Sequence, residues 1–126
     1  MHLKGVGIDI FEKKRMKAVL SRKSSAIFLK RVFRLAELKC FALPAGQCLH
    51  FSIAFALKEA VLKAMGMGLN TYTSFCDIEV QIKGKKAGIT LSGKIKSLAR
   101  RKGVKKIVCD YSVSPRHVVA VAVLVS

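Results

Sequence analysis

Acidic residues are scarce in this sequence of 126 residues. Seven aspartates and glutamates accompany 24 lysines and arginines, which gives a formal net charge of +17. An excess of one sign on this scale predicts an anionic partner whose association weakens as the salt concentration rises. The charge alone leaves three kinds of partner open: a nucleic acid, a phosphate-bearing cofactor or an acidic protein.

Aromatic residues that stack on nucleobases are also few. The chain has no tryptophan and only two tyrosines. It lacks the basic strand interleaved with aromatic residues that is typical of proteins binding single-stranded nucleic acids. A small basic nucleic-acid-binding module therefore stays an alternative that explains the charge and little else.

Long apolar runs and paired cysteines are absent as well. The longest apolar run, 118–125, is much shorter than the roughly 20 residues needed to cross a bilayer. Asp9 and Glu12 precede any long apolar segment, so no signal peptide is visible. The four cysteines form no Cys-x-x-Cys pair, and we expect buried free thiols. These absences predict a cytoplasmic protein that does not enter a membrane.

What is present indicates one α+β domain. The length permits a single hydrophobic core over residues 1–126, and the 52% of apolar and aromatic residues excludes a disordered chain. The order β-ααα-ββ-α-ββ predicts helices packed on a mainly antiparallel sheet. The predicted elements are a strand at 5–11, a basic helical region at 12–38 broken near Ser24-Ser25, a helix at 51–65, a strand pair at 75–82 and 89–91, a helix at 92–102, and strands at 107–113 and 118–125.

Asp9 stands out because aspartate is disfavoured inside strands. Gly7 lies on the same face of the predicted strand and leaves open space beside it. The carboxylate could cap the helix that follows. It could also be a metal ligand presented by a rigid element, and the residues by themselves leave both interpretations open.

Glu59 and Lys63 lie one turn apart on the long predicted helix. A glutamate four residues before a lysine is a favourable surface pair, worth about 0.3–0.5 kcal/mol. Two carboxylates and a lysine are also what a Mg²⁺–diphosphate site requires, because Mg²⁺ takes one or two carboxylates together with phosphate oxygens. Asp9 would be the second carboxylate.

The first strand, the long helix and the glycines after it together resemble the holo-[acyl-carrier-protein] synthases, the small bacterial branch of the 4′-phosphopantetheinyl transferases. The matching segments are 7–10, 55–64 and 66–68, with shorter matches at 28–38, 76–80, 84–85 and 120–123. The resemblance implies a 4′-phosphopantetheinyl transferase-like fold and a magnesium enzyme of fatty acid biosynthesis. Such an enzyme transfers the 4′-phosphopantetheine group of coenzyme A to a serine of an apo acyl carrier protein and releases 3′,5′-ADP.

The resemblance also implies roles for individual residues. Asp9 and Glu59 would bind Mg²⁺ together with the diphosphate of coenzyme A. Lys63 would neutralise charge that develops on the diphosphate, and Gly66 would contact coenzyme A beside it. The general base is left open between Glu59 and a water on the metal.

The implied partners are an acidic acyl carrier protein and further copies of the chain. Arg15 and Arg22 match the basic first helix that meets the carrier protein. The resemblance implies a homotrimer with the site between subunits. Residues 118–125 lend support, because an almost wholly apolar strand must be covered on both faces. The alternative is a strand enclosed by helices of its own chain.

Three residues depart from the family pattern. They are Ala54, Met67 and Pro115. These departures leave a degenerate, non-catalytic relative as a further alternative. His117, two residues after Pro115, is expected to be a turn residue rather than a ligand.

Overall fold

The computed structural model describes residues 1–41, 47–67 and 75–126. Its helices are α1 (Lys13–Leu20), α2 (Ser25–Val32), α3 (Leu35–Phe41), α4 (Gln47–Ala64) and α5 (Gly93–Arg101), with a short 3₁₀ helix at Phe75–Asp77. The strands are β1 (Leu3–Glu12), β2 (Ile78–Lys83), β3 (Lys86–Leu91), β4 (Lys106–Val113) and β5 (His117–Val125). The break expected at Pro44-Ala45-Gly46 and the second glycine of the 66–68 segment lie outside the described residues.

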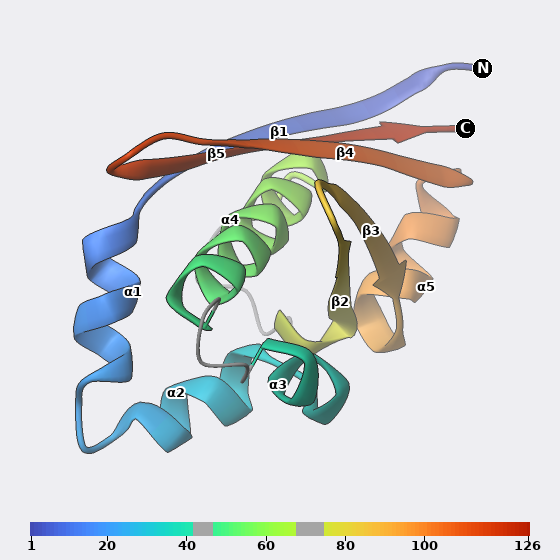
Figure 1. Cartoon of the computed structure of the whole chain (residues 1–126). Coiled ribbons are helices and arrows are strands. Elements are labelled where there is room, and N and C mark those ends of the chain that lie inside the picture. The colour runs from blue at the N-terminus through green and yellow to red at the C-terminus, as the bar shows by residue number, and fades with distance from the viewer. Residues whose placement is uncertain (42–46, 68–74) are drawn as a thin grey trace.

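The strands form two antiparallel sheets, which confirms the predicted α+β class. One sheet has three strands in the order β1-β5-β4, and the other is the β2-β3 hairpin. Helix α4 runs beneath the three-stranded sheet, and α1 and α5 lie at opposite ends of the molecule (Figure 1). No helix in the described part of the chain is long and apolar enough to span a membrane.

Close approach of β1 to α4 explains two glycines of the first strand. Gly5 and Gly7 lie on the face of β1 that is turned toward α4, and a Cβ atom on either would overlap a carbonyl oxygen of Ala64 or Ala60. Side chains at these two positions would push the strand away from the helix. The glycines therefore set the spacing at which Asp9, next on the same face, lies beside α4.

The predicted strand at 75–82 is wrong at its start. Residues Phe75–Asp77 form a 3₁₀ turn, and β2 begins at Ile78. The backbone oxygens of Phe75 and Ile78 both accept hydrogen bonds from the ammonium group of Lys58, at 3.0 and 2.6 Å. Carbonyls three residues apart in a strand point in opposite directions, so one donor reaches both only where the chain curls.

Other element boundaries differ more modestly. The region 12–38 contains two complete helices and the start of a third, because Phe33 takes an extended conformation that ends α2. Strand β3 begins at Lys86, earlier than predicted, since Lys86 pairs with Lys83 across a turn that places Gly84 at a φ of +61°. His117 begins β5, and its N–H donates to Ser114 Oγ at 3.0 Å, as expected of a turn residue. The cysteines are free as expected, but two are exposed and two half-buried.

Candidate active site

Asp9, Glu59 and Lys63 line one small cavity between β1 and α4. The cavity measures about 190 Å³, and its wall also contains Ile10, Phe11, Arg15 and Phe55. Asp9 reaches it because alternate residues of β1 face α4, and Glu59 and Lys63 reach it because they are one turn apart on the helix. The structure thus brings together three residues that are separated by up to 54 positions in the chain.

Lys63 is paired with Asp9. Its ammonium nitrogen lies 3.0 Å from Asp9 Oδ1 and donates a second hydrogen bond, also 3.0 Å, to the backbone oxygen of Ile8. The surface pair considered for Glu59 and Lys63 is therefore not formed. The helix-cap interpretation of Asp9 also fails, since the residue at the N-cap of α1 is Glu12.

Glu59 lies in an environment that disfavours its charge. Burial raises its pKa, and the nearby Asp9 carboxylate raises it further, while Lys63 and Arg15 act in the opposite direction. Two carboxylates this close repel each other when both are ionised. A divalent cation would relieve that repulsion, and carboxylate oxygens are the ligands that Mg²⁺ prefers.

The donor set fits Mg²⁺ bound together with a substrate. Within the described residues, no third aspartate, glutamate, histidine or cysteine joins Asp9 and Glu59. Mg²⁺ retains several water or phosphate oxygens and seldom occupies an all-protein cage. Two carboxylates in an open cavity leave room for such oxygens.

Arg15 lies in the wall of this cavity, a position that sequence reasoning missed. Its guanidinium carbon is 5.4 Å from the centroid of the Phe11 ring, and Phe11 packs on Phe55 with centroids 5.1 Å apart. Cations over aromatic faces are held in place by the ring quadrupole. Arg22, predicted to act with Arg15, lies in the exposed turn after α1 and outside the cavity.

Gly66 ends helix α4 at a left-handed position, with φ of +74°. Its N–H donates to the oxygen of Lys63 at 3.0 Å, and the N–H of Met67 donates to that of Leu62 at 2.9 Å. This pair of bonds is a Schellman motif. The turn exposes the backbone of Gly66 just beyond Lys63, and the space beside its Cα is open. A contact of Gly66 with coenzyme A stays a prediction.

A buried ion pair beneath the site was also missed. Lys58 Nζ lies 2.8 Å from Glu37 Oε1 and donates to the backbone oxygens of Val32, Phe75 and Ile78 at 2.6–3.0 Å. Burial lowers the pKa of Lys58, and Glu37 offsets part of that effect. The network ties the chain after α2, helix α3 and the start of β2 to the helix that carries Glu59.

The sequence did contain a signal for this network. Lys58 falls on the same face of α4 as Ala54 and Val61, both of which are fully buried. A lysine within an apolar helix stripe is either misplaced or paired inside the core. The pattern therefore indicates a buried lysine, although it does not identify Glu37 as the partner.

Comparison with known proteins agrees with this fold. The family model of the 4′-phosphopantetheinyl transferase superfamily matches residues 5–122. The chain is 32% identical over 122 residues to the holo-[acyl-carrier-protein] synthase of Syntrophus aciditrophicus, covering 95% of this chain and 94% of that protein. It is also 32% identical to the holo-[acyl-carrier-protein] synthase of Photobacterium profundum, in an alignment of 127 residues that covers the full length of both chains.

Solved structures are similar over nearly the whole chain. A holo-[acyl-carrier-protein] synthase from Helicobacter pylori in complex with coenzyme A has a TM-score of 0.79 at 26% identity, covering 95% of this chain and 99% of that one. A Plasmodium yoelii acyl carrier protein synthase with ADP bound has a TM-score of 0.82 at 32% identity, covering 98% and 95%. The chain belongs to the 4′-phosphopantetheinyl transferase superfamily, an enzyme family. Its relatives group it with the holo-[acyl-carrier-protein] synthases.

Proposed function

We propose that this enzyme transfers the 4′-phosphopantetheine group of coenzyme A to a serine of an apo acyl carrier protein, with Mg²⁺ held by Asp9 and Glu59. The observation that carries the proposal is the convergence of Asp9, Glu59 and Lys63 in one cavity. The relative in complex with coenzyme A supports the choice of donor.

The reaction is a substitution at phosphorus. The serine oxygen forms a bond to the phosphorus next to pantetheine, and the bond from that phosphorus to the bridging oxygen breaks. The serine proton passes to a base, either the Glu59 carboxylate or a water, and 3′,5′-ADP leaves. When bound, Mg²⁺ supplies charge stabilisation at the diphosphate. Lys63 adds a positive charge beside the same oxygens, and Arg15 extends the cationic wall of the cavity.

The alternatives account for less of the structure. Ala54, Met67 and Pro115, the residues that depart from the family pattern, do not line the Asp9 cavity. A degenerate relative would not need to keep that cavity intact. A nucleic-acid-binding module would leave the two carboxylates of the cavity without a purpose.

Intact-protein mass spectrometry tests the proposal directly. Apo carrier protein incubated with coenzyme A, Mg²⁺ and the enzyme should gain the mass of one phosphopantetheine group, and EDTA should prevent the gain. An unmodified carrier protein under all conditions would favour the degenerate relative. Tight oligonucleotide binding without transfer would favour the nucleic-acid module.

Lys63→Met should lower the turnover number by roughly 10²-fold, because it removes the charge next to the diphosphate while keeping a good helix former. Binding of carrier protein should be unchanged. Steady-state kinetics with both substrates provide the measurement, and Lys30→Met, an exposed lysine on α2, is the control. Full turnover in Lys63→Met would mean that the lysine serves only its ion pair with Asp9.

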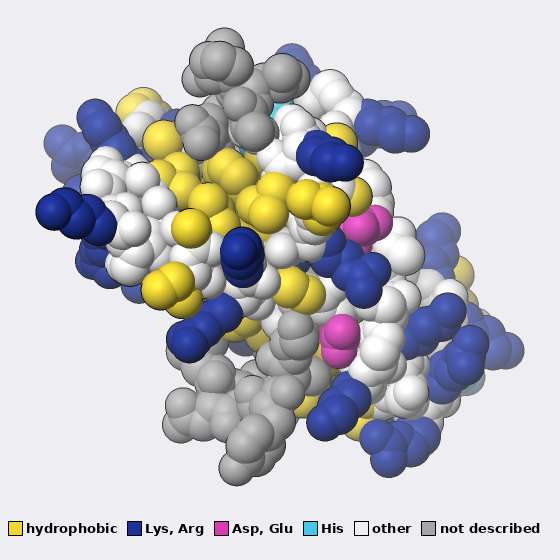
Figure 2. Space-filling model, turned by 90° about the horizontal axis from the view of Figure 1, so that it is seen from below, with side chains coloured by type: hydrophobic (Ala, Val, Ile, Leu, Met, Phe, Trp, Pro, Cys, Tyr) yellow, Lys and Arg dark blue, Asp and Glu magenta, His cyan; other side chains and the backbone are white. Residues whose placement is uncertain are grey.

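Basic side chains are spread over the face opposite the three-stranded sheet, with few acidic ones among them (Figure 2). We propose that the α1 end of this surface, including Arg15 and Arg22, docks the acidic carrier protein, because complementary charge speeds encounter. The two arginines should nevertheless respond differently to mutation, since only Arg15 lines the cavity.

Arg22→Glu should reduce kcat/KM for the carrier protein by about tenfold at low salt and flatten its salt dependence, without altering the Kd of coenzyme A. Arg15→Glu should lower kcat/KM for the carrier protein and also weaken the binding of coenzyme A, because it adds a third carboxylate to the cavity. Kinetics across a salt series and calorimetry with coenzyme A distinguish these effects. Arg101→Glu on α5 is the charge-matched control, and an equal loss there would remove the assignment of a docking site to α1.

The outer face of the three-stranded sheet supports a homotrimer. Helix α4 covers the inner face, where Val118, Ala120, Ala122 and Leu124 are fully buried, and no described helix or strand covers the other face (Figure 1). Six apolar residues of the outer face are 39–66% exposed: Leu3, Val6, Ile8, Ile10, Val108 and Val119. The described helices of this chain therefore do not enclose β5 on both faces, which was the alternative to a trimer. Further copies of the chain would cover this face.

Val108→Asp should convert the trimer to a monomer and lower activity if the site is shared between subunits. Val108 forms a row across the outer face with Val123 and Val6, so a charge there would be buried in the assembly. Light scattering coupled to gel filtration measures the mass. Leu35→Asp, at an exposed apolar residue of α3, is the control. A wild-type monomer with full activity on dilution would contradict the shared site.

A further inference from the structure

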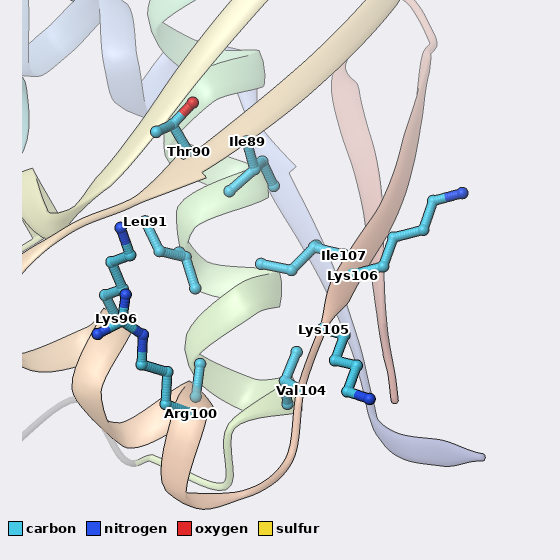
Figure 3. A pocket seen from close by; sticks show the side chains of 10 residues that line it. Ile89, Thr90, Leu91, Lys96, Arg100, Val104, Lys105, Lys106 and Ile107 are labelled. Atoms are coloured by element: carbon cyan, nitrogen blue, oxygen red, sulfur yellow. The ribbon is translucent and has the colours of Figure 1, made fainter. Parts of the chain in front are cut away.

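A second cavity lies between β3, α5 and the start of β4 (Figure 3). Its volume is about 400 Å³, within the range of small-molecule sites, and it shares no lining residue with the Asp9 cavity. Its location at the α5 end of the molecule also separates it from the α1 surface proposed for the carrier protein (Figure 1).

The inner wall of this cavity is apolar. In Figure 3 the side chains of Leu91 and Ile107 extend toward each other across the space, with Val104 beside them. Ile89 completes the wall, and all four residues are only half-buried. The cavity therefore leaves aliphatic surface in contact with water, and a ligand with an apolar part would cover it.

Every charged residue that lines the cavity is a cation. Lys96 and Arg100 lie one turn apart on α5. On the other side, Lys105 precedes β4 and Lys106 is its first residue, and the side chain of Lys106 extends away from the cavity (Figure 3). No aspartate or glutamate lines the cavity. Among the described residues, the ion pairs are Lys14–Glu12, Lys58–Glu37 and Lys63–Asp9, so these four charges have no acidic partner.

Helix electrostatics explain only part of this arrangement. Arg100 lies in the last turn of α5, where the helix dipole favours a cation. Lys96 lies in the first half of the helix, and Lys105 and Lys106 gain nothing from the dipole. Their shared position around one cavity indicates an anion that carries more than one charge.

We propose that this cavity binds an amphiphilic phosphate monoester, with the phosphate at Lys96 and Arg100 of α5 and a short aliphatic part on the apolar wall. A phosphate monoester is close to a dianion at neutral pH and offers three strong acceptor oxygens, which the charged groups of Lys96 and Arg100 can share. A carboxylate carries half that charge. Nucleic acid fits less well, because no aromatic residue that could stack on a base lines the cavity.

Titration with hexyl phosphate, methyl phosphate and hexanol tests the proposal. The probe signal is the NMR shift of the Ile89 and Ile107 methyl groups in isotope-labelled protein. We expect hexyl phosphate to shift both and to bind roughly tenfold or more tightly than methyl phosphate, because its extra methylene groups leave water. Hexanol should bind far more weakly than either phosphate.

Two double variants separate the site from the general charge of the protein. Lys96→Gln with Arg100→Gln should weaken hexyl phosphate binding by about tenfold or more. Lys94→Gln with Arg101→Gln removes the same charge from the same helix at residues that do not line the cavity, and should leave the affinity within about twofold. Equal losses in the two pairs would overturn the proposal.

Other outcomes would also overturn it. Equal affinity for methyl and hexyl phosphate would mean that the apolar wall is not used. Displacement of hexyl phosphate by a short DNA duplex at lower concentration than by any monoester would assign the surface to nucleic acid. Binding to phosphatidate-containing vesicles without binding of hexyl phosphate would assign it to a membrane rather than to a soluble ligand.

Discussion

Asp9→Asn and Glu59→Gln should each lower phosphopantetheine transfer by about 10³-fold or more, which corresponds to roughly 4 kcal/mol of transition-state stabilisation. Each substitution keeps the shape of the side chain and removes the charge that holds Mg²⁺. A site with only two protein ligands has little affinity left when one is lost. Each variant should therefore need much more Mg²⁺ for half-maximal activity than the wild type.

The measurement is the initial rate of transfer across a Mg²⁺ series, with circular dichroism to confirm folding. Glu79→Gln is a matched control, because Glu79 is a partly buried carboxylate that accepts a hydrogen bond from Gln81 and lies outside the cavity. Wild-type rates for Asp9→Asn and Glu59→Gln at limiting Mg²⁺ would remove the metal assignment.

Lys58→Met and Glu37→Gln should each destabilise the fold by about 3–5 kcal/mol, because removal of one partner leaves the other charge buried and uncompensated. The effect should be large at this pair because both side chains are almost fully buried. Lys58→Met also leaves three carbonyl oxygens without their donor, and Glu37→Gln weakens the acceptor of the N–H groups of Arg34 and Val80.

Urea unfolding at a fixed protein concentration provides the measurement, since assembly would make stability depend on concentration. Lys63→Met supplies a control on the same helix, because the side chain of Lys63 is about half exposed although it forms an ion pair with Asp9. That variant should lose less than about 1 kcal/mol. A double variant of Lys58 and Glu37 should be less destabilised than the sum of its parts. Losses below about 1 kcal/mol in both single variants would contradict the role of the buried pair.

Local periodicity determined much of the fold. The alternation at 5–11 predicted which residues of β1 share a face, because side chains of a strand alternate between two faces. The absence of glycine and proline between 51 and 65 predicted the helix that carries Glu59 and Lys63, and Gly66 predicted its end. These features depend on neighbours within a few residues, which a sequence displays directly.

Resemblance predicted the site residues, but their contacts depended on packing. Asp9 and Lys63 are far apart in the chain, and they meet because Gly5 and Gly7 let β1 approach α4. The same packing brings Arg15 into the cavity, where a helical pattern alone indicates only an exposed basic face.

The curled start of β2 was decided by tertiary structure alone. Residues 75–77 were predicted as the start of a strand, yet the ammonium group of Lys58 draws together the carbonyl oxygens of Phe75 and Ile78. A buried charge must be satisfied wherever its acceptors happen to lie in the chain. Composition and periodicity determined the elements and their faces, whereas the partner of each buried charge was decided only when those elements packed, because the acceptors come from segments distant in sequence.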